Sequence, residues 1–317
     1  MSNFIIDDLK NAFRRKDNGV IQIILINVII FLFINVVVAF MYFSSNMPQE
    51  VVIREDKFLS WFSLPAAPYY LIRRFWTIIT YMFTHEGFLH IFFNMLWFYW
   101  FGKILTAHLG NKRMISTYLL GGICGGLFYI VVYNLVNSIS PEVAQFQVAG
   151  TILLGASASV MAIVFAVATL MPENSLRFMF IGTIKFKYIA LGILVITTIL
   201  NFSDNTGGKI AHLGGAFYGW LYIRQYKKGN DISRGFNRLM DSLFAFFKPS
   251  KKIRVEYKKQ KRKQQKYKRP VSDMEYNAQK AREQAEIDKI LDKIAKSGYD
   301  SLTKEEKERL FKMSNKN

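Results

Sequence analysis

Four polar side chains in otherwise apolar stretches could together perform nucleophilic acyl transfer. Ser157 supplies a hydroxyl, His212 an imidazole, and His90 and Asn94 supply hydrogen-bond donors. The hydroxyl would attack a carbonyl carbon, and the imidazole would take its proton and later pass it to the leaving amine. Asn94, His90 and the backbone N–H of Ser157 could stabilise the developing oxyanion. These stretches contain no Asp or Glu, so the sequence predicts a dyad rather than a triad.

Each of these residues also has an ordinary structural explanation when considered alone. A serine in a membrane helix usually bonds its own backbone, and a histidine usually bonds a neighbouring helix. The combination favours chemistry, because three separate apolar segments carry the hydroxyl, the imidazole and the His90–Asn94 pair. Asn94 follows His90 by four residues, so both face the same way on a helix.

Long apolar segments must position these side chains. A helix needs about 20 apolar residues to cross the hydrocarbon core of a membrane. The first, third and fourth of six candidate segments lack charges; the others are weaker, and strict hydropathy would count only three. The predicted fold is an all-α polytopic membrane protein, a six-helix bundle with a small helical cytoplasmic tail. The predicted spans are residues 20–43, 87–107, 114–137, 147–171, 188–202 and 207–226.

The distribution of Lys and Arg predicts the orientation. The side that holds the N-terminus, the loops after the second and fourth spans and the tail has 13 of these residues near the spans, and the other side has five. This asymmetry places both termini in the cytoplasm and the protein in the cell membrane. His90, Ser157 and His212 then lie about 5, 15 and 8 Å into their spans at about 1.5 Å per residue. The site would open to the outer side.

Composition excludes several classes of protein. Residues 1–226 carry a net charge of +6 and residues 227–317 a net charge of +13, which together give +19 over 317 residues. An apolar first part and a charged last part exclude an ordinary soluble enzyme. The single cysteine, Cys124, excludes an internal disulfide and a multi-cysteine zinc site, and no cofactor is expected. The apolar run at 20–43 is too long for a signal peptide and should stay in the membrane.

Three short motifs resemble those of the rhomboid family of intramembrane serine proteases, in its bacterial form with six spans and a basic cytoplasmic extension. They occur in the order of the family, on the second, fourth and sixth predicted spans. The motifs are Thr84-His-Glu-Gly-Phe-Leu-His-Ile-Phe-Phe-Asn-Met95, Gly155-Ala-Ser-Ala158 and Ala211-His-Leu-Gly-Gly-Ala-Phe-Tyr-Gly219. The resemblance covers about residues 20–226. It implies cleavage of single-span membrane proteins within or beside their transmembrane helix.

The resemblance also implies a role for each matching polar residue. Ser157 matches the nucleophile and His212 the base. His90 and Asn94 match the residues that bind the oxyanion. His85 matches a structural histidine at the start of the second span.

The glycines of the same motifs predict close helix packing. Gly215 and Gly219 continue a stripe of small residues at four-residue spacing, and Gly155 precedes Ser157 by two residues. Two positions depart from the family pattern. Ala158 replaces the second glycine of Gly-x-Ser-Gly, and Met161 stands where an aromatic residue often stacks on the histidine.

The sequence also has three alternative interpretations to proteolysis. The main alternative is a catalytically inactive relative that binds transmembrane clients, although such proteins typically lose the serine or the histidine. The pair His85-Glu86 followed by His90 resembles a zinc motif, but the histidines are five residues apart instead of four and face different directions on a helix. A transporter is disfavoured, because the chain shows no internal repeat and no intramembrane carboxylate.

The predicted domain organisation has four parts. A cytoplasmic N-terminus covers 1–19, and the membrane domain covers 20–226 with an interfacial outer loop at 44–86. A basic linker follows at 227–274, and a helical hairpin at 275–317. Between residues 248 and 269 the linker has 12 Lys/Arg and one acid, which suits anionic lipid headgroups. A merely solvated linker is the alternative, and no specific nucleic acid is expected.

The hairpin prediction rests on two local patterns. Ile287, Ile290, Leu291 and Ile294 have the spacing of one helix face. Thr303-Lys-Glu-Glu306 fits a capping box that begins a second short helix. The apolar face is too small for a stable independent core, so the hairpin is expected to dock on a partner, a second copy or the inner loops.

Overall fold

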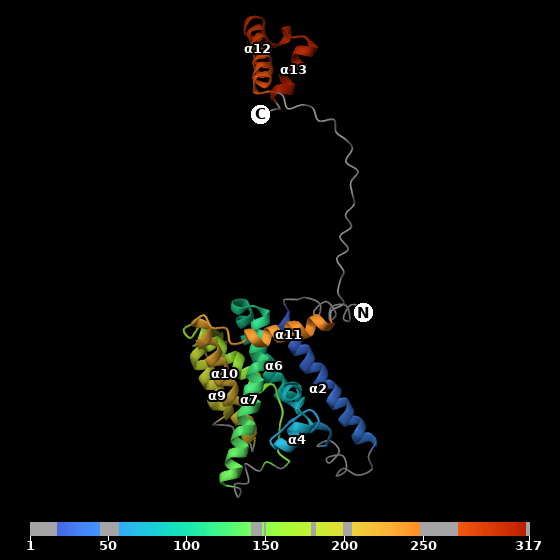
Figure 1. Cartoon of the computed structure of the whole chain (residues 1–317), viewed down its shortest axis with the longest axis vertical. Coiled ribbons are helices and arrows are strands. Elements are labelled where there is room, and N and C mark those ends of the chain that lie inside the picture. The colour runs from blue at the N-terminus through green and yellow to red at the C-terminus, as the bar shows by residue number, and fades with distance from the viewer. Residues whose placement is uncertain are drawn as a thin grey trace. The chain divides into compact units, whose positions relative to one another are not determined.

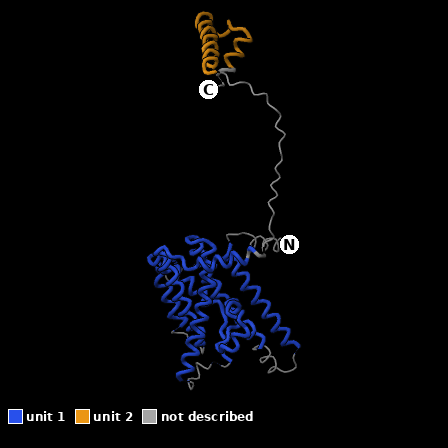
Figure 2. Tube along the Cα trace, viewed as in Figure 1, with its two compact units in different colours: residues 1–249 blue, residues 250–317 orange. Residues whose placement is uncertain are grey.

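The computed structural model describes residues 18–44, 57–140, 148, 150–178, 182–198, 205–247 and 272–314. The chain divides into two compact units, residues 1–249 and 250–317 (Figure 2). The first unit is a bundle of helices (Figure 1). Its principal helices are α2 (Gly19–Ser44), α6 (Phe88–Leu109), α7 (Asn111–Ile139), α8 (Ser157–Leu170), α9 (Phe186–Thr198), α10 (Thr206–Lys227) and α11 (Arg234–Phe247).

Three of these helices, α2, α6 and α7, are long and apolar enough to cross a membrane. Helices α8 and α9 are apolar but shorter, with 14 and 13 residues. The chain is therefore an all-α polytopic membrane protein, as predicted. The count of six spans stays a prediction, because a complete crossing needs about 20 residues.

Short elements connect the long helices. Between α2 and α6 lie β1 (Leu64–Pro65), α4 (Pro68–Arg73), α5 (Thr77–Thr80) and the 3-10 helix η1 (Tyr81–Phe83). Strand β1 pairs antiparallel with β2 (Ile152–Leu153) ahead of α8. Strands β3 (Ser175–Phe178) and β4 (Gly182–Lys185) form a hairpin between α8 and α9.

The aromatic segment ahead of α6 is folded onto itself where the structure describes it. The rings of Trp61 and Trp76 stack with centroids 6.1 Å apart. Arg74 donates a hydrogen bond of 2.9 Å to the carbonyl of Ser60, and its guanidinium lies over the Trp61 ring. Residues 45–56 of the predicted interfacial loop lie outside the described residues.

The predicted span at 147–171 begins too early. Helix α8 starts at Ser157, and Ile152 and Leu153 ahead of it form a strand. Composition could not show where the helix begins, because a short buried strand is as apolar as a helix. Ser157 therefore lies in the first turn of its helix, not ten residues into it.

The predicted linker at 227–274 also differs from the structure, because α11 occupies Arg234–Phe247. The apolar residues of this helix alternate with polar and charged ones, so hydropathy does not distinguish it from a linker. Residues 248–271, which contain that run, lie outside the described residues.

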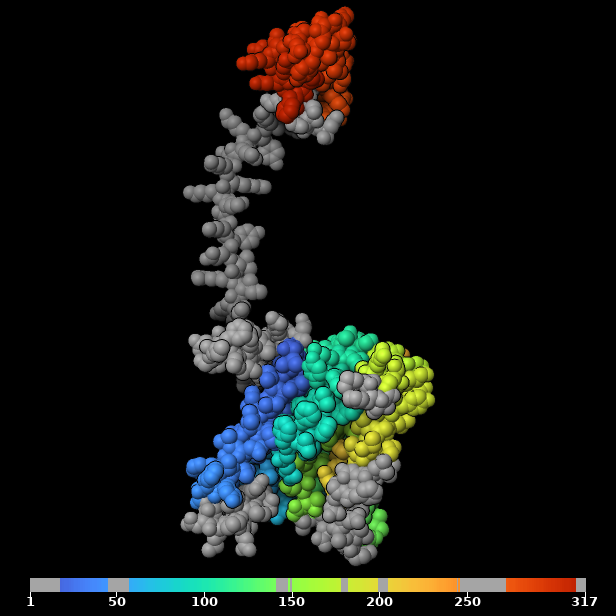
Figure 3. Space-filling model, turned by 180° about the vertical axis from the view of Figure 1, so that it is seen from behind, coloured from blue at the N-terminus to red at the C-terminus, as the bar shows by residue number. Residues whose placement is uncertain are grey.

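Helices α7, α8 and α10 form the centre of the bundle and pack through small residues. A Cβ atom added to Gly121 would lie 2.1 Å from the Cβ of Ala162, and one added to Gly125 would lie 2.7 Å from the carbonyl oxygen of Ala211. Apolar helices gain little by leaving lipid, so association in a membrane depends on such close van der Waals packing. On the opposite face, α2 packs against α6 (Figure 3).

The second unit contains α12 (Asp273–Ser297), η3 (Tyr299–Ser301) and α13 (Lys304–Ser314). Its helices lie in the segment for which a hairpin is predicted. Ser272 and Glu275 form a reciprocal capping box at the start of α12. Ile290 and Leu302 are buried, and Lys293 forms an ion pair of 3.0 Å with Glu306.

Candidate active site

One cavity of about 490 Å³ is lined by all four residues predicted to do chemistry. Ser157 comes from α8, His212 from α10, and His90 and Asn94 from α6. Helix α9 contributes Ile193 and Thr197 to the same wall. The structure thus brings together residues up to 122 positions apart in the chain.

The turn ahead of Ser157 is held by two backbone hydrogen bonds. The N–H of Gly155 donates to the carbonyl of Tyr81 at 2.9 Å. The N–H of Ala156 donates to Nε2 of the fully buried His85 at 3.3 Å. Ser157 follows as the first residue of α8. A helix leaves the N–H groups of its first turn without intrahelical acceptors, so this N–H is available to an oxyanion.

Gly155 is required at its position for two reasons. Its φ of +116° is a conformation that other residues rarely adopt. A Cβ atom there would also lie 2.9 Å from Cε1 and Nε2 of His90. The rings of His85 and His90 lie 5.1 Å apart, so one histidine holds the turn and the other lies beside it.

His212 reaches the cavity because α10 packs directly onto the backbone of α8. Cβ atoms added to Gly215 and Gly219 would each lie 2.1 Å from a carbonyl oxygen of α8, those of Ala158 and Ala162 respectively. The first of these contacts is one residue from Ser157 and three residues from His212. The helix contact therefore fixes how close the hydroxyl and the imidazole come.

The imidazole ring of His212 is not occupied by structural hydrogen bonds in the described part of the chain. Its Nδ1 has no hydrogen-bond partner within the described part of the chain. In the described part of the chain no hydrogen bond joins the His212 ring to Ser157 either. Catalytic hydrogen bonds are often long without substrate and tighten in the complex, so the absence of this bond is compatible with a nucleophile and its base.

Asn94 is nearly buried and has a donor to spare. Its Nδ2 donates to the carbonyl of His90 at 2.8 Å, four residues earlier on α6. An amide has two N–H donors, so the second remains for a ligand in the cavity.

The two departures from the family pattern act in different places. Ala158 is buried against α7, where a Cβ atom added to Gly125 would lie 2.6 Å from the Cβ of Ala158. Ala158 is not among the described residues that line the cavity. Met161 does line the cavity, one helical turn beyond Ser157. The added methyl group therefore affects helix packing, and the methionine affects the shape of the site.

Sequence reasoning missed two polar residues of the cavity wall, Asn205 and Thr197. Asn205 caps α10, because its Oδ1 accepts the N–H of Gly208 at 2.8 Å. An asparagine just before an apolar helix is an N-cap signal and could have been recognised. Thr197 gave no comparable signal. Among the described residues no cluster of His, Cys, Asp or Glu could hold a metal ion.

Residues 73–228 match the family model described as Rhomboid domain. The membrane domain of this chain belongs to the rhomboid family. The resemblance read from three motifs is thereby confirmed for the family. Residues 272–316 match a separate model, described as a family of unknown function, DUF6576, so the rhomboid domain and the second unit match different families.

Curated relatives of the rhomboid domain come from plants and animals. RHOMBOID-like protein 12, mitochondrial, of Arabidopsis thaliana is 31% identical over 163 residues, which cover 49% of this chain and 48% of that protein. Presenilin-associated rhomboid-like protein A, mitochondrial, of Danio rerio is 28% identical over 148 residues, which cover 44% of this chain and 35% of that protein. Inactive RHOMBOID-like protein 8 of Arabidopsis thaliana is 32% identical over 78 residues, 25% of this chain and 22% of that protein. The chain thus matches less than half the length of each.

Proposed function

We propose that the rhomboid domain is an intramembrane serine endopeptidase. The observation that carries this proposal is that Ser157, His212, His90 and Asn94 line one cavity although they come from three helices. Packing alone would not require a hydroxyl, two imidazoles and an amide to meet at one place in an apolar bundle. Acyl transfer requires these groups, and their arrangement around Ser157 suits it.

In the first half of the reaction the Oγ of Ser157 attacks the carbonyl carbon of the substrate peptide, and His212 accepts its proton. The carbonyl oxygen becomes an oxyanion, for which the N–H of Ser157, the amide of Asn94 and the ring of His90 are donors. The C–N bond then breaks, the imidazolium gives its proton to the leaving amine, and Ser157 carries the acyl group as an ester.

In the second half a water molecule gives a proton to His212 and attacks the ester carbonyl. The C–O bond to Ser157 breaks, and Oγ recovers the proton from His212. The oxyanion of this step uses the same three donors. Hydrolysis needs water, so the site must admit water while it excludes lipid. The polar side chains of Thr197 and Asn205 in the cavity wall are suitable for hydrogen-bonding that water.

The substrate is a single-span membrane protein that reaches the cavity between α6 and α9. Residues of both helices line the cavity. Unlike α8 and α10, they are not joined by an extensive helix–helix contact in the described part of the chain. A substrate segment entering here in extended form would place its carbonyl groups beside Ser157.

The protein lies in the cell membrane with both termini in the cytoplasm. Positive charge supports this orientation, because the end of the bundle where α6 meets α7 and where α10 ends carries Lys112, Arg113, Arg224 and Lys227. The active site then opens to the outer side. The mitochondrial location named for two relatives belongs to those proteins.

The second candidate function is binding of transmembrane clients without cleavage. It is favoured by the match to a relative that is itself named inactive, and by Met161 in the cavity wall. Under this proposal the cavity would recognise an unwound client segment, and Ser157 would have no enhanced reactivity.

Covalent labelling of Ser157 decides between the two. The full chain in liposomes is treated with a fluorophosphonate probe and the adduct is mapped by mass spectrometry. We expect labelling at Ser157 that is lost in Ser157→Ala and His212→Ala. Ser159→Ala is the matched control, because Ser159 lies on the same helix, buried against Gly122 and away from the cavity. Absence of labelling in folded protein would favour client binding.

A further inference from the structure

Helix α11 has one apolar face and one polar face. Phe236, Leu239, Met240 and Leu243 follow the i, i+3, i+4, i+7 spacing of a single helix face. The polar residues of the helix lie on the other side: Arg234, Asn237, Arg238, Asp241 and Ser242. Leu239 and Leu243 are 57% and 49% exposed, so the described protein leaves part of the apolar face uncovered.

Helix α11 lies at one end of the helix bundle. The helix runs across the end of the bundle at which α7 begins (Figure 1). Two ion pairs fasten this region to the start of α7. Asp231 accepts from Nε of Arg113 at 2.9 Å, and Asp241 pairs with Lys112. Helix α7 is long and apolar enough to cross a membrane. We therefore expect a helix across its first turn to lie at the level of the lipid headgroups, where an amphipathic helix buries its apolar face.

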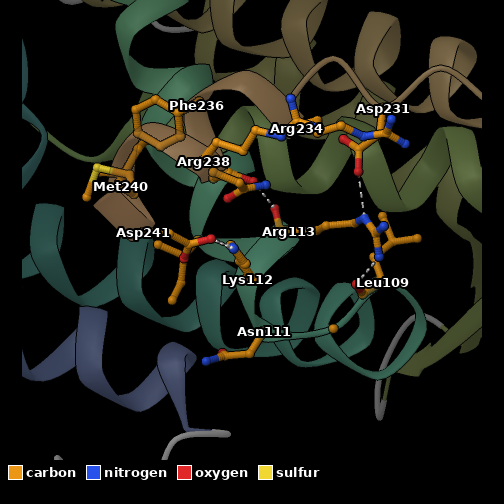
Figure 4. Close-up of a pocket in the computed structure, with 15 residues that line it drawn as sticks. Leu109, Asn111, Lys112, Arg113, Asp231, Arg234, Phe236, Arg238, Met240 and Asp241 are labelled. Atoms are coloured by element: carbon orange, nitrogen blue, oxygen red, sulfur yellow. Dashed lines mark hydrogen bonds and ion pairs between the residues drawn. The ribbon is translucent and has the colours of Figure 1, made fainter. Parts of the chain in front are cut away.

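A cavity of about 620 Å³ lies between α11 and the turn that joins α6 to α7. Four cationic side chains and two carboxylates line it (Figure 4). The carboxylates of Asp231 and Asp241 are paired with Arg113 and Lys112. Arg234 and Arg238 also line the cavity, and neither forms an ion pair with any residue that the structure describes. Arg234 and Arg238, one helical turn apart on α11, are therefore the two cationic residues of the cavity without an ion-pair partner among the described residues.

We propose that α11 is a surface helix lying in the plane of the membrane, and that the cavity behind it binds the phosphate headgroup of an anionic phospholipid through Arg234 and Arg238. Guanidinium groups bind phosphate oxygens with two parallel hydrogen bonds, so two arginines without ion-pair partners are suitable ligands for a phosphate. The location selects a lipid over a free anion, because the cavity opens beside an exposed apolar face that acyl chains would cover. Bound lipid would bridge α11 to the α6–α7 turn.

Lipid binding to the intact protein tests the site. The full chain in detergent is titrated with dioctanoyl phosphatidylglycerol or dioctanoyl phosphatidylcholine, and thermal unfolding is followed by circular dichroism. Binding to the folded state raises the unfolding temperature. We expect phosphatidylglycerol to stabilise the protein more than phosphatidylcholine does, and Arg234→Gln/Arg238→Gln to need about tenfold or more of it for the same effect.

Matched variants and a second anion make the outcome specific. Lys280→Gln/Arg282→Gln removes the same charge from exposed positions of α12 and should respond as the wild type does. Equal responses of the two double variants would overturn the proposed site. Equal stabilisation by inorganic phosphate at the same concentration would overturn the assignment to lipid.

The surface position of α11 has its own test, which does not depend on the arginine variants. Spin labels are attached to Leu239→Cys or Ser242→Cys in a Cys124→Ala background, in liposomes that contain phosphatidylglycerol. We expect the label at 239 to be accessible to oxygen dissolved in the lipid, and the label at 242 to a water-soluble nickel reagent. Aqueous accessibility at both positions would overturn the in-plane arrangement.

Discussion

The backbone carbonyl of Ala158 on α8 lies directly against Gly215 of α10, so that a Cβ atom on the glycine would come within 2.1 Å of its oxygen. No side chain fits there without separating the two helices. The contact lies next to Ser157 and one turn from His212, so helix separation would also separate the proposed dyad.

Gly215→Ala should therefore impair both stability and reactivity. Overpacking of a tight contact costs about 1–3 kcal/mol, and we expect a lower unfolding temperature together with loss of probe labelling at Ser157. Gly192→Ala on α9 is the matched control, since an added Cβ there meets nothing within 4 Å. If Gly215→Ala labels and unfolds as Gly192→Ala does, the contact does not position the dyad.

His85 should act by positioning the turn before Ser157 rather than by touching substrate. His85→Ala removes the acceptor of the Ala156 N–H, and a buried donor left without a partner costs about 1–3 kcal/mol. We expect slower labelling of Ser157 and partial rescue by His85→Gln, which restores an acceptor. His108→Ala, at an exposed site on α6, should change neither labelling rate nor unfolding temperature. Equal behaviour of the two alanine variants would contradict the positioning role.

Asn94→Ala should lower the rate of cleavage without preventing folding. Loss of one oxyanion donor costs on the order of 100–1,000-fold in kcat, whereas substrate binding should change little. The comparison variant is Asn35→Ala, because Asn35 makes the same bond to the carbonyl four residues earlier but is exposed on α2. The measurement is kcat and KM for a transmembrane substrate. A rise in KM with unchanged kcat would argue against transition-state stabilisation.

Glu173 should make a pH-dependent contribution to the loop between α8 and α9. Hydrogen bonds from Lys185 and then Lys187 lower the pKa of this carboxyl to about 2. A lowered pKa means stability that is fully present above the ordinary glutamate value and is lost as pH falls through the folded value. The difference in unfolding temperature between wild type and Glu173→Gln should be constant above about pH 4.5 and shrink toward pH 2. Because the group is exposed, the difference should be small and should fall with added salt; an increase toward low pH would contradict the pairing.

The proposed orientation predicts which cysteines a membrane-impermeant maleimide reaches in intact cells. In a Cys124→Ala background, Ser138→Cys at the end of α7 should be labelled from outside. Asn230→Cys, just after α10, should be labelled only after the cells are opened. Both positions are exposed, so the reverse pattern would mean the opposite orientation.

The sequence was informative where residue type and helix spacing determine the structure together. Gly215 and Gly219 predicted close packing because glycine has few other uses at four-residue intervals on a membrane helix, and the structure has both against the α8 backbone. Even the Gly-rich segment predicted at 207–226 coincides closely with α10.

Hydropathy was not informative about backbone conformation or about helices outside the membrane. The start of α8 was misplaced because Ile152 and Leu153 are apolar both in a strand and in a helix. Helix α11 was missed because its apolar residues are separated by charged ones and do not form a continuous apolar run. The position of Asn205 in the cavity wall depends on tertiary structure, since residues of α6, α8, α9 and α10 line the same cavity.

The contact between α8 and α10 also has a consequence for how the site could evolve. Ala158 and Ala162 meet Gly215 and Gly219 at the same four-residue interval, so the two helices cannot slide past each other by one residue without a clash. The position of His212 relative to Ser157 therefore depends on the number of residues between each side chain and this contact. One residue inserted between His212 and Gly215 would rotate the imidazole by about 100° around α10, so insertions and deletions here are excluded even where substitutions are tolerated.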